Sequence, residues 1–176
     1  MGKRTVFSIV ILLLAVAADA RPRDGLDDPQ TPPDRHGKSA ARTIAYGRDA
    51  LQRLDVWTVP GSDAAPLVMF VHGGGWQRGS KDNASSRWLP AHLTQQGYAY
   101  ASIDYRLVPA VAVEQQAEDV AHALRALLDR AAELGIDRRR VVLIGHSAGA
   151  HLVALVGTDE RHLKSAGLGF ADLRGV

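Results

Sequence analysis

The chain has 176 residues, enough for one domain, and its apolar content of 46% is ordinary for a globular protein. Its 21 basic and 19 acidic residues leave a formal net charge of +2, and the basic residues are scattered, so the sequence indicates no nucleic-acid-binding surface. The absence of cysteine excludes disulfides, thiolate catalysis and cysteine-ligated metal.

The N-terminus has the pattern of a signal peptide for export. Basic residues precede an apolar run over residues 6–18, and the small residues Ala18 and Ala20 provide a cleavage site after Ala20. The run is too short for a bilayer, which needs roughly 20 residues. We therefore predict a signal peptide at residues 1–20, a secreted or periplasmic location, and no stable membrane span after cleavage.

Residues 21–41 contain four prolines, many charges and few large apolar side chains. Such a segment cannot bury enough apolar surface to offset its chain entropy, so we predict a flexible linker. The folded domain is then expected over residues 42–176.

Strand and helix patterns alternate along this domain. The predicted strands cover Thr43–Tyr46, Leu54–Val59, Leu67–Val71, Tyr98–Ile103 and Val141–Ile144, and the predicted helices cover Ser85–Gln96, Glu114–Leu134 and Ala148–Val156. Pro90 predicts a kink or a restart in the first helix, and Gly135 is expected to end the second. The continuously apolar strand at 67–71 is expected to be covered on both faces. This alternation predicts an α/β fold with a mostly parallel sheet and helices on both faces. In such sheets the functional residues gather at the carboxyl ends of the strands.

The first informative motif lies between the last predicted strand and the last predicted helix. Gly145, His146, Ser147, Ala148 and Gly149 match G-x-S-x-G, in which a sharp strand-to-helix turn exposes a nucleophilic serine. Glycines flank the serine because a Cβ there would clash with neighbouring backbone. The alternative is a glycine-rich turn with an ordinary surface serine, but the strand before and the helix after favour catalysis by Ser147.

The second motif is His-Gly-Gly-Gly-Trp at residues 72–76, directly after the third predicted strand. Glycine-rich backbone lets N–H groups approach the oxyanion that forms during acyl transfer, and this pattern is associated with lipases and esterases. We predict an oxyanion hole formed by the amides of Gly74, Gly75 and Ala148. A phosphate-binding loop is excluded, because the segment matches neither G-x-G-x-x-G nor the Walker A pattern.

The remaining motif residues are expected to support this site. His72 and Gly73, like the two turn glycines, are predicted to be structural, with the His72 ring bracing the loop by hydrogen bonds. The alternative, His72 as catalytic base, is disfavoured because triad order places the base after the serine. Trp76 and His146 are candidates for the acyl pocket, although Trp76 can equally be a packing residue.

The motifs at 72–76 and 145–149 together resemble the α/β-hydrolase family, and more narrowly its HGGG-type esterase/lipase branch, close to feruloyl-esterase-like and arylformamidase-like members. The resemblance covers about residues 46–176. Supporting stretches are Ser102–Leu107, Glu118–Val120 and Gly149–Leu152.

The resemblance implies an α/β-hydrolase fold whose strand order begins 1-2-4-3-5 and continues with further strands beyond the strand at 141–144. It also implies that Asp104 and Arg106 are structural residues paired inside the domain. Asp119 is expected to be a residue on the face of its helix.

In this family the triad runs serine, acid, histidine along the chain. His151 lies on the serine's own helix, and Asp159 and His162 are expected in a surface loop, so neither they nor Glu160 or Asp172 is predicted to be catalytic. We therefore expect the triad acid and histidine, with the C-terminal strands and helices, to be absent from this chain. The strand at 141–144 would then be an unprotected edge that promotes aggregation.

The predicted function is hydrolysis of small-molecule carboxylic esters through an acyl-enzyme on Ser147, with no metal or organic cofactor. The chain by itself is expected to be a poor catalyst. The alternatives are an amidase or arylformamidase on the same site, and a non-catalytic hydrolase-fold domain that binds a partner.

Overall fold

The computed structural model describes residues 41–83 and 88–176. The predicted signal peptide, the linker up to residue 40 and the start of the first predicted helix lie outside the described residues. Signal cleavage and the linker therefore stay predictions.

A five-stranded sheet forms the centre of the domain. Its strands are β1 (Arg42–Ala45), β2 (Arg53–Trp57), β3 (Ala65–Val71), β4 (Ala99–Ile103) and β5 (Ile136–Gly145). Their order is β1-β2-β4-β3-β5, which confirms the predicted beginning 1-2-4-3-5. Strand β2 runs antiparallel to its neighbours β1 and β4, whereas β4, β3 and β5 are mutually parallel. The carboxyl ends of these three strands therefore meet at one edge of the sheet.

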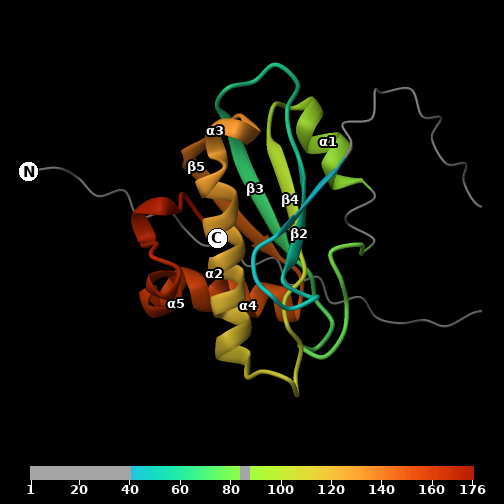
Figure 1. Cartoon of the computed structure of the whole chain (residues 1–176), viewed down its shortest axis with the longest axis vertical. Coiled ribbons are helices and arrows are strands. Elements are labelled where there is room, and N and C mark those ends of the chain that lie inside the picture. Colours follow the sequence, from blue (N-terminus) through green and yellow to red (C-terminus); the bar gives the residue numbers. More distant parts are fainter. Residues whose placement is uncertain (1–40, 84–87) are drawn as a thin grey trace, which may run out of the picture. The chain divides into compact units, whose positions relative to one another are not determined.

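Helices lie on both sides of the sheet. They are α1 (Leu89–Gln95), α2 (Val113–Asp129), α3 (Ala131–Leu134), α4 (Ala148–Thr158) and α5 (Glu160–Ser165), followed by the 3₁₀ turn η2 (Phe170–Asp172). Helices α2, α4 and α5 pack against one another, and α1 packs against β4. Figure 1 shows α2 on one side of the strands and α1 on the other.

The core lies between the sheet and α2. Leu67 and Met69 of β3 are fully buried, as are Leu124 and Leu127 of α2. Each such side chain contributes roughly 1.5–3 kcal/mol on leaving water. The opposite sheet face is less well covered: Val68, Val142 and Ile144 are only partly buried. The expectation that the apolar strand at 67–71 is covered on both faces is therefore wrong at Val68.

Two predicted helices differ from the structure. Helix α1 begins at Leu89, with Pro90 in its first turn, so the proline stands at a helix start and does not kink α1. The helix predicted over residues 114–134 is interrupted at Arg130, whose φ of −105° and ψ of 13° separate α2 from α3. Neither glycine nor proline signals this break. Gly135 ends α3 with left-handed backbone, as the sequence indicated.

The last strand is longer and better covered than predicted. β5 begins at Ile136, and residues near the C-terminus pair with its outer edge. The N–H of Arg174 donates to the Val141 carbonyl at 2.8 Å, and the N–H of Leu143 donates to the Gly175 carbonyl at 3.1 Å. The expectation of an unprotected edge is therefore wrong at Val141 and Leu143.

Candidate active site

The parallel strands bring the two predicted site segments together. Val71 at the end of β3 is in register with Ile103 of β4 and with Gly145 of β5. The residues that leave these strands, among them His72 and His146, therefore start from neighbouring positions. The glycine loop and the serine turn, whose motifs begin at residues 72 and 145, are distant in sequence but adjacent in the fold.

Ser147 occupies the turn between β5 and α4. It precedes the first residue of α4, its φ is 52° and its ψ is −118°, and its hydroxyl makes no capping hydrogen bond. The residue is exposed. Among the described residues, only Trp76 and Ser147 are non-glycine residues with positive φ. Such strained backbone concentrates at functional sites, and both residues belong to the predicted site.

The two glycines of the turn allow backbone to pack on backbone. A Cβ on Gly149 would lie 2.1 Å from the Val71 carbonyl oxygen, and a Cβ on Gly145 would lie 2.5 Å from the Gly149 carbonyl. Real Cβ atoms do not approach so closely, so neither position accepts a side chain without movement. The turn is therefore fixed directly against the end of β3.

Gly73 packs against the serine turn. A Cβ on Gly73 would lie 2.7 Å from the His146 carbonyl oxygen, 2.9 Å from His146 Nδ1 and 3.1 Å from Ser147 Cβ. The glycine loop therefore approaches the serine as closely as backbone atoms allow. His146 itself is exposed and lies next to this contact.

The predicted oxyanion donors come from these two segments. Gly74 and Gly75 have φ values of 131° and 61°, which favour glycine, and Ala148 is the first residue of α4. Within the described residues, the N–H groups of these three residues take no part in the backbone hydrogen bonds of the loop and turn. The partial positive charge at the N-terminus of α4 favours an anion at the same place.

His72 is buried beneath the glycine loop. Its Nδ1 is 2.8 Å from the Gly73 carbonyl oxygen, and its ring stacks on Tyr105 with centroids 4.3 Å apart. Burial lowers the pKa of His72, so the ring is neutral and Nδ1 donates to the carbonyl. Tyr105 donates its hydroxyl to the His72 carbonyl at 2.8 Å. This geometry fits the predicted brace.

Trp76 joins the loop to two helices. Its carbonyl accepts the N–H of Val108 at 2.9 Å and the side-chain amide of Gln116 on α2 at 2.8 Å. Its ring meets the exposed His151 of α4 edge-on, with centroids 5.5 Å apart. Trp76 therefore both packs and lies beside the helix that carries the serine. Gln116 has no recognisable sequence signal.

The acidic and histidine residues after Ser147 are engaged locally. Asp159 caps α5 and pairs with Arg161, whose guanidinium lowers the pKa of Asp159 to about 2. Glu160 pairs with Lys164, and Asp172 accepts the N–H of Gly169 at 2.9 Å. His162 lies buried within α5, so its expected place in a surface loop is wrong.

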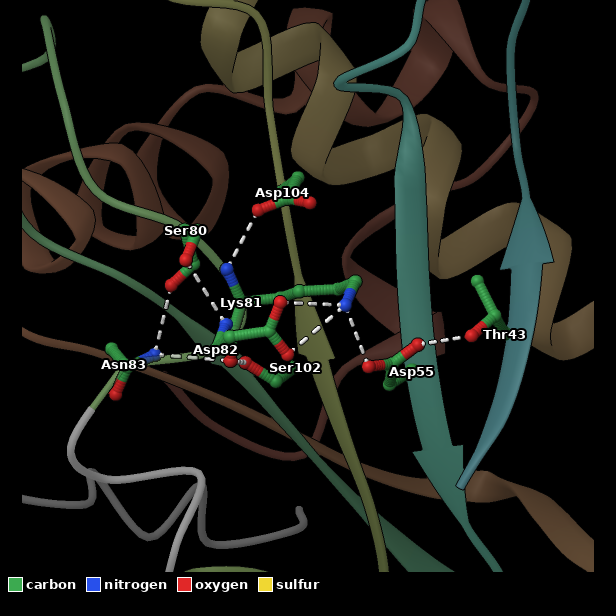
Figure 2. Close-up of polar contacts among 8 residues, drawn as sticks. All are labelled: Thr43, Asp55, Ser80, Lys81, Asp82, Asn83, Ser102 and Asp104. Atoms are coloured by element: carbon green, nitrogen blue, oxygen red, sulfur yellow. Dashed lines mark hydrogen bonds and ion pairs between the residues drawn. The ribbon is translucent and has the colours of Figure 1, made fainter. Parts of the chain in front are cut away.

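Of the two charged residues after β4, Arg106 is ion-paired inside the domain, as the resemblance implied, and the Asp104 carboxylate binds a backbone N–H. Arg106 binds the Asp119 carboxylate through Nε at 2.8 Å and Nη2 at 2.7 Å. Asp119 is fully buried, so it lies on the inner face of its helix. Asp104 accepts the backbone N–H of Lys81 at 2.6 Å (Figure 2). Lys81 lies in a segment for which the sequence predicted no role.

Residues 41–83 and 88–176 contain no group of histidine, cysteine or acidic side chains arranged to hold a metal ion. None of their helices combines the length and apolar character needed to cross a membrane.

The known proteins that this chain resembles include esterases and a formamidase. The BD-FAE family model matches residues 54–169. Esterase LipC of Mycobacterium tuberculosis is 37% identical over 119 residues, which cover 66% of this chain and 29% of LipC. Kynurenine formamidase of Drosophila melanogaster is 35% identical over 114 residues, which cover 64% of this chain and 36% of the formamidase. The crystal structure of Esterase B from Lactobacillus rhamnosis superposes with a TM-score of 0.61 at 31% identity, covering 74% of this chain and 43% of that chain.

The sheet order and the solved structures define an α/β-hydrolase fold. Because the family model covers about two thirds of its residues, the chain belongs to the BD-FAE family, a family of α/β-hydrolase esterases. The chain spans about a third of the length of the two curated relatives described above.

Proposed function

We propose that this chain carries the nucleophile and the oxyanion hole of a serine hydrolase that cleaves carboxylic esters of small molecules. The observation that carries the proposal is the contact between Gly73 and the exposed, strained Ser147. Ser147 then lies beside a loop in which the N–H groups of Gly74 and Gly75 take no part in the backbone hydrogen bonds of the described residues. The relation to LipC and Esterase B supports ester hydrolysis as the reaction.

The proposed reaction has two steps. Ser147 attacks the ester carbonyl, and the amides of Gly74, Gly75 and Ala148 stabilise the oxyanion, each donor contributing roughly 3 kcal/mol of barrier lowering. The alcohol leaves, and water hydrolyses the acyl-enzyme. Neither step calls for a metal or an organic cofactor.

The general base is proposed to come from outside the described residues. His72 is committed to the Gly73 carbonyl, and His151 and His162 belong to α4 and α5. We also propose that the 176-residue chain by itself hydrolyses activated esters poorly, with only residual catalysis from the oxyanion hole.

A fluorophosphonate probe tests the nucleophile. Mass spectrometry of the purified chain should find slow labelling at Ser147 and none in Ser147→Ala. Added imidazole should accelerate labelling of the parent chain, because imidazole in solution can act as the general base. If Ser147 stays unlabelled with imidazole present, the alternative of a non-catalytic binding domain is favoured.

The second candidate function is amide hydrolysis on the same site. It is favoured by the relation to kynurenine formamidase. Residual rates on p-nitrophenyl butyrate and on formanilide, each corrected by the Ser147→Ala variant, would distinguish the two. A larger Ser147-dependent rate on formanilide would favour the formamidase.

Export is proposed from residues 1–20. N-terminal sequencing of protein recovered from a bacterial periplasm should begin at Arg21. An intact Met1 on protein that stays in the cytoplasm would contradict export.

A further inference from the structure

Lys81 follows the glycine loop. Three of its atoms form hydrogen bonds to residues of β2, of β4 and of the position directly after β4. Its N–H donates to Asp104 Oδ1 at 2.6 Å, its carbonyl accepts the Ser102 hydroxyl at 2.8 Å, and its Nζ donates to Asp55 Oδ2 at 2.8 Å (Figure 2). Asp55, Ser102 and Asp104 are all buried. Both the backbone and the side chain of one residue are therefore fixed to the sheet.

The partners of Lys81 are themselves held in place. Asp55 also accepts the Thr43 hydroxyl at 2.6 Å, so both of its oxygens are bonded. Asp104 directly follows β4, and its N–H donates to the Arg53 carbonyl at 2.9 Å. Because a buried ion pair adds little net stability, its presence here favours a role in fixing geometry.

Gly79, two residues before Lys81, packs against the start of the glycine loop. A Cβ on Gly79 would lie 2.3 Å from the Gly73 carbonyl oxygen and 2.6 Å from His72 Nδ1. The end of the loop at Gly79 therefore packs against the hydrogen bond between His72 and Gly73. A shift of Gly79 with Lys81 would therefore change the packing against this hydrogen bond, next to Gly74 and Gly75.

We propose that Asp104 is a positioning residue for the oxyanion hole: it binds the N–H of Lys81 and thereby holds the loop over residues 72–79 against the serine turn. The inference rests on the proposed function for its catalytic consequence. The structural part of the proposal is that the hydrogen bond from the Lys81 N–H to Asp104 holds the loop over residues 72–79 in place. We call this hydrogen bond the clamp, and it can be tested without any catalytic measurement.

Amide hydrogen exchange by NMR tests the clamp in the 176-residue chain. The N–H groups of Gln77 and Arg78 donate to the Gly74 carbonyl, so their exchange reports loop opening. In Asp104→Ala these two amides and that of Lys81 should exchange about tenfold faster or more, as expected for loss of a hydrogen bond to a charged group. Amides of β3 and β5 should keep their exchange rates. Asp104→Asn retains an acceptor oxygen and should restore slow exchange.

Asp137→Ala is the matched control. Asp137 also accepts a backbone N–H, that of Arg139 at 2.9 Å, and pairs with Arg140, but it lies at the other end of β5. This variant should leave the exchange of Gln77 and Arg78 unchanged. Should Asp104→Ala fail to fold, Ser102→Ala removes the hydroxyl bond to the Lys81 carbonyl and should loosen the same amides.

Labelling at Ser147 supplies the catalytic readout. With imidazole present, Asp104→Ala should lower the maximal rate of fluorophosphonate labelling about tenfold with an unchanged half-saturating probe concentration, and Asp104→Asn should recover most of it. Unchanged loop exchange in the alanine variant, or equal loosening in Asp137→Ala, would overturn the clamp. Loosened loop amides without any Ser147 labelling in the parent chain would retain the clamp and reject the hydrolase.

Discussion

Tyr105 stacks on His72 and also donates its hydroxyl to the His72 carbonyl, so one buried side chain fixes both the ring and the backbone at the start of the glycine loop. Burial raises the pKa of Tyr105 to about 12, which keeps this hydroxyl protonated near neutral pH.

Tyr105→Phe should retain the stacking and lose the hydrogen bond. Because the bond is buried, we expect a loss of about 1–2 kcal/mol in the free energy of unfolding, measured by urea denaturation. Tyr98→Phe is the matched control, since Tyr98 is exposed, and it should change stability by less than about 0.5 kcal/mol. Equal effects of the two variants would show that the Tyr105 hydroxyl does not support the loop.

Gly73→Ala should separate the glycine loop from the serine turn. Its Cβ would meet the His146 carbonyl at 2.7 Å, and overpacking of this kind costs about 1–3 kcal/mol. Because small displacements of catalytic groups are costly, imidazole-assisted labelling of Ser147 should fall about 100-fold. Gly61→Ala is the control: a Cβ there meets no atom within 4 Å, so its cost is backbone strain alone and labelling should persist. Normal labelling of Gly73→Ala would contradict the proposed site.

His72 should make stability depend on pH. Burial lowers its pKa below the ordinary value of 6.5, so in acid the unfolded chain binds a proton that the folded ring rejects. Protonation of His72 therefore does not affect the free energy of unfolding above pH 6.5. Below that pH it lowers the free energy of unfolding, because only the unfolded chain gains the proton. Urea midpoints measured from pH 7.5 to 5 should fall less steeply in His72→Gln than in the parent chain. Parallel curves would contradict a neutral, buried His72.

Asp119→Ala should be strongly destabilising. The substitution removes the buried carboxylate that binds the Arg106 guanidinium in a bidentate manner. We expect the free energy of unfolding, measured by urea denaturation, to fall by about 3 kcal/mol. Asp129→Ala breaks an exposed pair with Arg125 and should leave the midpoint nearly unchanged. A small effect at Asp119 would indicate that Arg106 finds solvent or another partner.

Arg174→Pro should uncover the outer edge of β5. Proline removes the N–H that donates to the Val141 carbonyl, whereas Arg174→Ala retains it and is the control. Because Val142 and Ile144 are only partly buried, an open edge beside them should promote association, measured by sedimentation velocity. A monomeric Arg174→Pro variant that unfolds cooperatively would contradict this expectation.

The sequence by itself determined the alternation of strands and helices, the family resemblance and the two motifs of the site. These signals are local: an apolar run marks a buried strand, and glycines around Ser147 mark a backbone that cannot carry side chains there. The strand order was available only through the resemblance, since periodicity does not say which strands pair.

Tertiary structure alone decided how the site is held. The hydrogen bonds of Lys81 join a loop to Asp55 of β2 and to Ser102 of β4, and the bond from Gln116 to the Trp76 carbonyl joins α2 to that loop. The burial of His162 and the pairing of Gly175 with β5 have the same origin. Each depends on residues distant in sequence whose side chains carry no periodic signal, so contacts made only after the chain folds determine them.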